Sequence, residues 1–125
     1  MHASAAPFAT ELKLGPHRGL ADEPVDLGGG DSGPTPDEIA LSALGACTAI
    51  TLRMYAQRKQ WPLEQVEVEL AFLERGKERS VIERRVHLLG PLDDEQRARL
   101  LQIANACPVH RLLTGEVEIP TVLAA

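Results

Sequence analysis

The chain has 125 residues, of which 44% are hydrophobic and 25% charged, and its formal net charge is −5. A chain of this length can bury roughly two thirds of its unfolded surface, so we expect a single domain, residues 1–125, with residues 1–7 as a loose tail. The acidic balance and the absence of clustered Lys and Arg argue against nucleic acid or an anionic membrane surface as a partner.

The N-terminal part of the sequence predicts a short β-hairpin. Residues 8–14 alternate apolar and polar side chains roughly with period two, as an edge strand does. Residues 15–19 contain two glycines and a proline and predict a turn that carries Arg18. Residues 20–27 are interrupted by a proline and predict a short return strand, and the glycine-rich loop 28–34 leads out of it.

The central element is a long helix over residues 36–59. Thr35 is a favourable N-cap, Pro36 suits the first helical position, and Glu38 completes a capping box. Between residues 39 and 50 nearly every side chain is apolar or very small, so this part of the helix must be covered on all sides. One small sheet covers only one side. We therefore expect a second copy of the chain to cover the rest, in an obligate homodimer.

A second hairpin follows the long helix. Residues 66–72 and 82–88 alternate apolar and polar side chains and predict two strands, joined by a turn at residues 76–78. The acidic side chains of the first strand are expected to face Arg84 and Arg85 across the ribbon, on a solvated surface rather than in a site.

The C-terminal part predicts two further helices and a strand. Asp93 is expected to cap a helix that runs through Ala106, and Cys107 to cap a short helix over residues 108–113. Residues 116–122 predict a last strand, which their proline keeps at a sheet edge. This order of strands and helices places the chain in the α+β class.

The chain has two cysteines, too few for a secreted disulfide scaffold. The N-terminus lacks a signal-peptide pattern and no window has the length and composition of a membrane span, so we expect a cytoplasmic protein in a reducing compartment. A buried cysteine in a helix, such as Cys47, is more often an inert small hydrophobe than a nucleophile. No cation lies close to Cys47 in the sequence, so its activation needs Arg18, Arg53 or a residue of a second subunit.

Cys107 has a more reactive setting. It is predicted at a helix N-terminus, where free N–H groups favour a thiolate and where His110 and Arg111 can add positive charge. The same residues permit a zinc site, formed by Cys107 and His110 together with Cys47 and a further histidine. A structural zinc site usually has two close ligand pairs and this chain has one, so we expect neither a metal nor another cofactor.

Several motifs of this sequence occur together in one known family. They are Asp22-Glu23-Pro24, Leu27-Gly28-Gly29, Gly33-Pro34-Thr35-Pro36, Ala43-Leu44-Gly45-Ala46-Cys47-Thr48 and Ala106-Cys107-Pro108-Val109-His110-Arg111. The set closely resembles the OsmC/Ohr family of thiol peroxidases, the osmotically inducible protein C and organic hydroperoxide resistance proteins. The resemblance spans about residues 12–123, and the specific signal is a Pro-led helix with the first cysteine combined with a Cys-Pro for the second.

The resemblance implies a fold and an activity. Members of this family form an intertwined homodimer in which long central helices pack against antiparallel sheets from both chains. They reduce organic hydroperoxides and hydrogen peroxide through a cysteine sulfenic acid and a disulfide. By position, Cys47 matches the peroxidatic cysteine and Cys107 the resolving cysteine.

The resemblance also implies supporting residues and a reductant. An arginine of the N-terminal hairpin, matched by Arg18, and a glutamate near the start of the long helix orient and activate the first thiol. Asp37 stands ten residues before Cys47, at the family's carboxylate position, and Glu38 is preferred for its longer side chain. The expected reductant is a dithiol of the lipoyl type. The alternative is a non-enzymatic dimeric module that binds a small hydrophobic ligand at the subunit interface, with incidental thiols.

Overall fold

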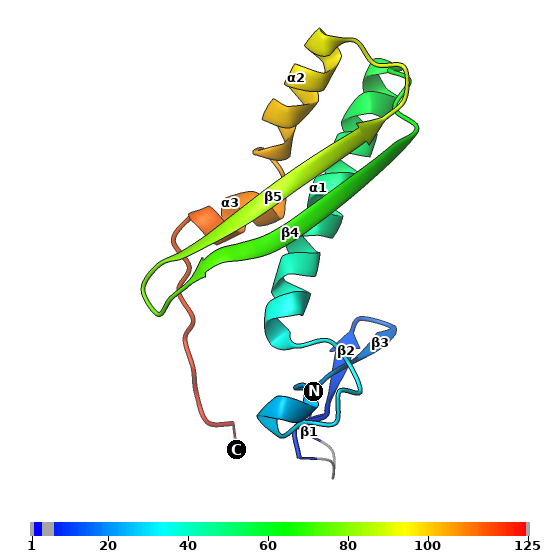
Figure 1. The fold of residues 1–125 in the computed structure, drawn as a ribbon. Helices are drawn as coiled ribbons and strands as arrows, with labels where there is room; N and C mark the ends of the chain where they lie inside the picture. Colours follow the sequence, from blue (N-terminus) through cyan, green and yellow to red (C-terminus); the bar gives the residue numbers. More distant parts are fainter. Residues whose placement is uncertain (1, 4–6, 125) are drawn as a thin grey trace. The chain divides into compact units, whose positions relative to one another are not determined.

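The computed structural model describes residues 2–3 and 7–124, and Figure 1 shows its elements in chain order. Residues 1 and 4–6 of the expected tail lie outside the described part, as does residue 125. The chain divides into two compact units, residues 1–42 and 43–125, each of which has its own sheet. The single domain expected from the chain length stays a prediction.

The first unit contains a three-stranded antiparallel sheet in the order β1–β2–β3, formed by β1 (His2–Ala3), β2 (Thr10–Leu14) and β3 (His17–Ala21). The β1 residues pair with β2, although they were expected to belong to a loose tail. A two-residue turn joins β2 to β3, because Gly15 takes a φ of 66° and reverses the chain at once. Arg18 was expected in the turn. It lies instead on β3, opposite Lys13.

Asp22 organises the loop that follows β3. Its carboxylate accepts hydrogen bonds from the backbone N–H groups of Glu23 (2.8 Å), Gly30 (3.2 Å) and Ser32 (3.1 Å) and from the Ser32 hydroxyl (2.6 Å). The Ser32 hydroxyl and these amides hold the pKa of Asp22 below its ordinary value. The expected return strand is correct for residues 20–21 but wrong further on, where Val25–Leu27 form the short 3-10 helix η1. The curvature that wraps the loop around Asp22 is incompatible with an extended strand.

Helix α1 (Pro36–Lys59) begins with the expected capping box. The Glu38 N–H donates to the Thr35 hydroxyl at 3.1 Å, and the Thr35 N–H donates to the Glu38 carboxylate at 2.9 Å. The carboxylate of Glu38 is thus a helix cap, and the Thr35 amide and hydroxyl lower its pKa.

Only one stripe of α1 is buried in this chain. Leu44, Thr48, Leu52 and Ala56 recur every fourth residue and face the core. Ile50 and Met54, on another face, are each 58% exposed.

Helix α1 is long and apolar enough to cross a membrane by length and composition, which corrects the expectation that no such window exists. The core helix of a water-soluble protein meets the same criterion.

In the second unit, β4 (Gln65–Arg75) and β5 (Ser80–Leu89) form a two-stranded antiparallel ribbon. Val68 lies opposite Val86 and Leu70 opposite Arg84 on one face. On the other face Arg85 and His87 interact with Glu69, at 3.9 Å and 3.0 Å. The expected pairing with acidic residues is therefore confirmed for Arg85 and wrong for Arg84, because side chains alternate between the two faces of a strand.

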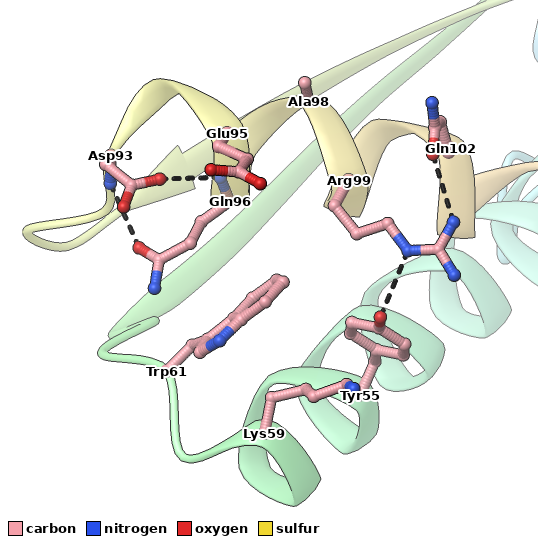
Figure 2. Close-up of a pocket in the computed structure, with 9 residues that line it drawn as sticks. All are labelled: Tyr55, Lys59, Trp61, Asp93, Glu95, Gln96, Ala98, Arg99 and Gln102. Carbon is pink, nitrogen blue, oxygen red and sulfur yellow. Dashed lines mark hydrogen bonds between the residues drawn. The ribbon is translucent and has the colours of Figure 1, made fainter.

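Helix α2 (Asp94–Ala104) packs with α1 and the ribbon. Its expected cap, Asp93, makes a capping box with Gln96, and the helix ends at Ala104, two residues before the expected end. The core cluster that joins these elements consists of Leu52, Leu92, Leu100 and Ala104. Figure 2 shows the outer edge of the same contact, where the Arg99 Nε donates to the Tyr55 hydroxyl at 3.1 Å.

Helix α3 (Pro108–Thr114) begins after Cys107, which is its N-cap as expected. The expected strand over residues 116–122 is wrong: this segment has no regular secondary structure, and Ile119 within it is 80% exposed. Apolar alternation alone does not make a strand, since the backbone groups also need a ladder partner. Within the described part of this single chain, residues 116–122 pair with no strand.

Candidate functional site: two thiols at the start of α3

The fold brings Cys47 and Cys107 close together. Cys47 lies on α1 next to the buried Thr48 and is partly exposed, whereas Cys107 is fully buried. Both are free thiols, and two consecutive residues of α3 donate their backbone N–H groups to the two sulfurs. The two cysteines that the sequence singled out thus form one pair.

Consecutive backbone amides at the start of α3 hold the two sulfurs. The Val109 N–H donates to the Cys47 Sγ at 3.5 Å, and the His110 N–H donates to the Cys107 Sγ at 3.3 Å. The first N–H groups of a helix have no partner within the helix, so they are available to sulfur. Pro108 occupies the first helical position, where its missing N–H leaves no group unpaired.

The Thr48 side chain is the buried polar group next to Cys107. Its Oγ1 is 3.8 Å from the Cys107 Sγ and donates to the Leu44 carbonyl at 2.7 Å. A hydroxyl has one proton, so Thr48 cannot donate to Leu44 and to Cys107 through separate hydrogens. With Cys107 protonated, the thiol donates to Thr48; with Cys107 ionised, the hydroxyl can turn and donate to the sulfur.

Arg84 reaches this pair from β5. Its guanidinium donates to the Thr48 Oγ1 at 3.1 Å, to the Asn105 Oδ1 at 3.0 Å and to the His110 Nδ1 at 3.1 Å. The solvated surface position expected for Arg84 is therefore wrong, and the pattern of charges in the sequence does not indicate this role. The signal was nevertheless present, since period two places Arg84 on the same strand face as Ile82 and Val86.

His110 is neutral in this arrangement. A guanidinium only donates, so the His110 Nδ1 must accept and the ring proton sits on Nε2. Burial and the charge of Arg84 both lower the pKa of His110. The sequence predicted that His110 and Arg111 supply positive charge to Cys107. His110 is neutral and Arg111 is exposed, and the charge near Cys107 comes from Arg84.

Opposing effects act on Cys107. Burial favours the neutral thiol and would raise its pKa. The His110 N–H, the Thr48 hydroxyl, the Cys47 thiol and the charge of Arg84 favour the thiolate, and together they bring the pKa of Cys107 below its ordinary value. The arrangement can therefore hold a buried thiolate beside a second, more accessible thiol.

The other expected site residues lie in the first unit. Arg18 is on β3, Asp37 and Glu38 are in the first turn of α1, and the Glu38 carboxylate is bonded to the Thr35 amide. Among the described residues, no hydrogen bond or ion pair joins Arg18 to Glu38. The structure thus brings together Cys47 and Cys107 and gives Glu38 a capping role.

A cavity of about 220 Å³ borders the thiol network. Leu44, Arg84 and His110, which also contact the thiols or Thr48, line it together with Ser80, Ile82, Leu113 and Thr114. A larger hollow of about 540 Å³ between α1 and α2 contains neither cysteine (Figure 2). In the described part of the chain, no three His, Cys, Asp or Glu side chains gather as a metal site requires.

Known structures share this fold. An OsmC-like protein from Mycoplasma pneumoniae is 17% identical, with a TM-score of 0.74 over 86% of this chain and 79% of that one. An organic hydroperoxide resistance protein, OsmC, from Legionella pneumophila is 18% identical, with a TM-score of 0.57 over 91% and 93%. A Vibrio cholerae protein assigned to organic hydroperoxide resistance, with captopril in one of its active sites, is 19% identical, with a TM-score of 0.64 over 91% and 82%.

The sequence itself carries the family assignment. No protein of curated function matches the chain in sequence. The family model described as OsmC-like protein matches residues 28–122, which include α1 with Cys47 and α3 with its Cys107 cap. The chain belongs to the OsmC-like protein family.

Proposed function

We propose that this chain is a thiol peroxidase that reduces organic hydroperoxides, and hydrogen peroxide, with Cys47 and Cys107. The observation that carries the proposal is the pair of adjacent sulfurs held by the Val109 and His110 amides. Membership of the OsmC-like family, with fold neighbours assigned to organic hydroperoxide resistance, supports the same chemistry.

Cys47 is the proposed attacking residue. It is partly exposed and can meet a peroxide, whereas Cys107 is fully buried. The Cys47 thiolate attacks one oxygen of the peroxide, the O–O bond breaks, and the departing alkoxide takes a proton to become the alcohol. The product on the enzyme is the Cys47 sulfenic acid.

Cys107 is the proposed resolving residue. Its thiolate attacks the Cys47 sulfur of the sulfenic acid, an S–S bond forms, and hydroxide leaves and takes a proton to become water. The two sulfurs accept from consecutive amides, those of Val109 and His110, which places them close to each other for this step. The lowered pKa of Cys107 favours the thiolate, which is the form that attacks.

The proposed reductant is a small dithiol of the lipoyl class. The Cys107 side of the disulfide is buried, so a slim flexible dithiol has better access than a folded protein such as thioredoxin. Two electrons from the dithiol return both cysteines to thiols, and the dithiol becomes a cyclic disulfide. The proposed compartment is the reducing cytoplasm, as expected from the small number of cysteines in the sequence.

The proposed assembly is a homodimer. The exposed apolar face of α1, with Ile50 and Met54, is the kind of surface that a second copy covers. Arg18 and Glu38 keep their proposed roles as the arginine and carboxylate that support Cys47. Asp37 is the alternative to Glu38, whose carboxylate already serves as a helix cap.

Mass spectrometry after one equivalent of peroxide tests the proposal. We expect the wild type to lose two hydrogens as the Cys47–Cys107 disulfide forms, and the Cys107→Ser variant to gain one oxygen on Cys47. An unchanged mass for both proteins after the peroxide treatment would contradict the proposed peroxidase activity. It would favour the alternative of a non-enzymatic module that binds a small hydrophobic ligand.

A further inference from the structure

We propose that Arg84 is the positioning residue that stabilises the Cys107 thiolate, acting through the Thr48 hydroxyl and through its own positive charge. Nothing in the family resemblance assigns this role to a residue of β5. The importance of the thiolate for turnover rests on the proposed function. The stabilisation itself can be measured without any peroxide.

The first support is the position of the guanidinium. Arg84 binds Thr48 on α1, Asn105 at the end of α2 and His110 on α3. Cys107 lies between Asn105 and His110 in the sequence, and its Sγ is 3.8 Å from the Thr48 Oγ1. Three hydrogen bonds in different directions fix a planar group that would otherwise be mobile.

The second support is the proton of the Thr48 hydroxyl. Arg84 donates to the Thr48 Oγ1, so that oxygen is already an acceptor and its own proton is polarised towards the next partner. The Leu44 carbonyl takes that proton at 2.7 Å when Cys107 is neutral. A negative sulfur is the stronger acceptor, so ionisation of Cys107 favours a turn of the hydroxyl towards it.

The third support is the neutrality of His110. The titratable groups that face Cys107 are Cys47 on α1, Arg84 on β5 and His110 on α3. The bond from Arg84 makes the His110 Nδ1 an acceptor and excludes the imidazolium. Arg84 is thus the cation of this set, and the lowered pKa of Cys107 agrees in direction.

The competing explanation is that Arg84 is only a structural clamp between β5 and the helices. A clamp affects the stability of the fold but leaves the ionisation of Cys107 unchanged once the fold is intact. The decisive measurement is therefore the ionisation midpoint of Cys107, read from the ultraviolet absorbance of the thiolate. This signal needs no reagent to enter the buried site.

The experiment uses a Cys47→Ser background, in which Cys107 is the remaining cysteine. Arg84→Gln should raise the midpoint by about one pH unit. Arg84→Lys should raise the midpoint less than Arg84→Gln does, because lysine keeps the positive charge but does not reproduce the planar geometry of the three hydrogen bonds. Arg85→Gln is the matched control: its side chain is 65% exposed, interacts with Glu69 and should leave the midpoint unchanged.

Thr48 provides an independent arm if Arg84→Gln does not fold. Thr48→Val should raise the midpoint and Thr48→Ser should not, because serine retains the hydroxyl that accepts from Arg84. The proposal is overturned if folded Arg84→Gln matches Arg85→Gln, or if Thr48→Val matches Thr48→Ser. If the wild type shows no peroxide turnover but the variants shift the Cys107 midpoint as expected, the proposed function is contradicted and the role of Arg84 is still supported.

Discussion

The Val109 N–H donates to the Cys47 Sγ at 3.5 Å and so connects residues 62 positions apart in the chain. The next amide of the same helix turn, from His110, serves Cys107. One short helix therefore fixes both sulfurs, and any change in how α3 docks alters the distance between them. The reactivity of the pair depends on the packing of α3 against α1 and β5.

The free energy of unfolding should rise with pH, because the fold lowers the pKa of both Cys107 and His110. A depressed thiol pKa stabilises the fold above the unfolded value, near 8.5, and this stabilisation is lost as the pH falls through the folded value. Below about pH 6.5 the unfolded state gains a proton on His110 that the fold resists, so stability falls further. Urea unfolding at about pH 6 and about pH 9 measures this difference in the free energy of unfolding, which should be larger at the higher pH.

Two variants separate these contributions to the pH dependence. His110→Gln should flatten the lower part of the profile, and Cys107→Ala should flatten the upper part. A wild-type profile that is level between these pH values would show that neither group differs between the folded and unfolded states.

Leu100→Ala should destabilise the second unit by about 2–5 kcal/mol. Leu100 is fully buried in the cluster that joins α2 to α1 and the ribbon, so truncation leaves a cavity. Its neighbour Leu101 is 60% exposed, and Leu101→Ala should cost less than about 1 kcal/mol. Equal urea midpoints for the two variants would contradict the described packing of α2.

Asp22→Asn should loosen the loop over residues 28–32. The substitution removes the charge from a carboxylate that four hydrogen bonds hold. Hydrogen exchange at the amides of Gly30 and Ser32 should become faster, on the order of tenfold. Asp26 is exposed, so Asp26→Asn is the control and should leave these rates unchanged.

Ile50→Asp should convert the proposed dimer to a monomer. Ile50 is 58% exposed on an apolar face of α1, and a buried carboxylate at an interface is strongly unfavourable. Sedimentation at micromolar concentration distinguishes the two states. Ala98→Asp, at an exposed position on α2, is the control and should remain dimeric. A wild type that sediments as a monomer would refute the assembly.

Local signals in the sequence predicted the helices well. The caps Thr35, Asp93 and Cys107 were each identified from the residue type and its neighbours, and each is present. These features depend on a few adjacent residues, which is why one sequence suffices to find them. The same locality places Cys47 on α1 and Cys107 at the N-cap of α3 but does not show that consecutive amides hold both sulfurs.

Features that depend on distant partners were predicted less well. The apolar alternation of residues 116–122 predicted a strand, yet no strand within the described part of the chain pairs with it. Arg84 was assigned to the surface because charged side chains usually lie there, although its strand parity pointed inward. Arg18 was matched through the family resemblance, and its support of Cys47 stays a prediction.

Rapid-mixing measurements with tert-butyl hydroperoxide under anaerobic conditions test the central claim most directly. The wild type and Cys107→Ser should each consume one peroxide per chain in the first turnover, and Cys47→Ser should consume none above the rate without protein. Turnover with dihydrolipoamide should then continue in the wild type and exceed turnover with thioredoxin. Equal peroxide consumption by the wild type and Cys47→Ser would contradict the assignment of Cys47 as the attacking thiol.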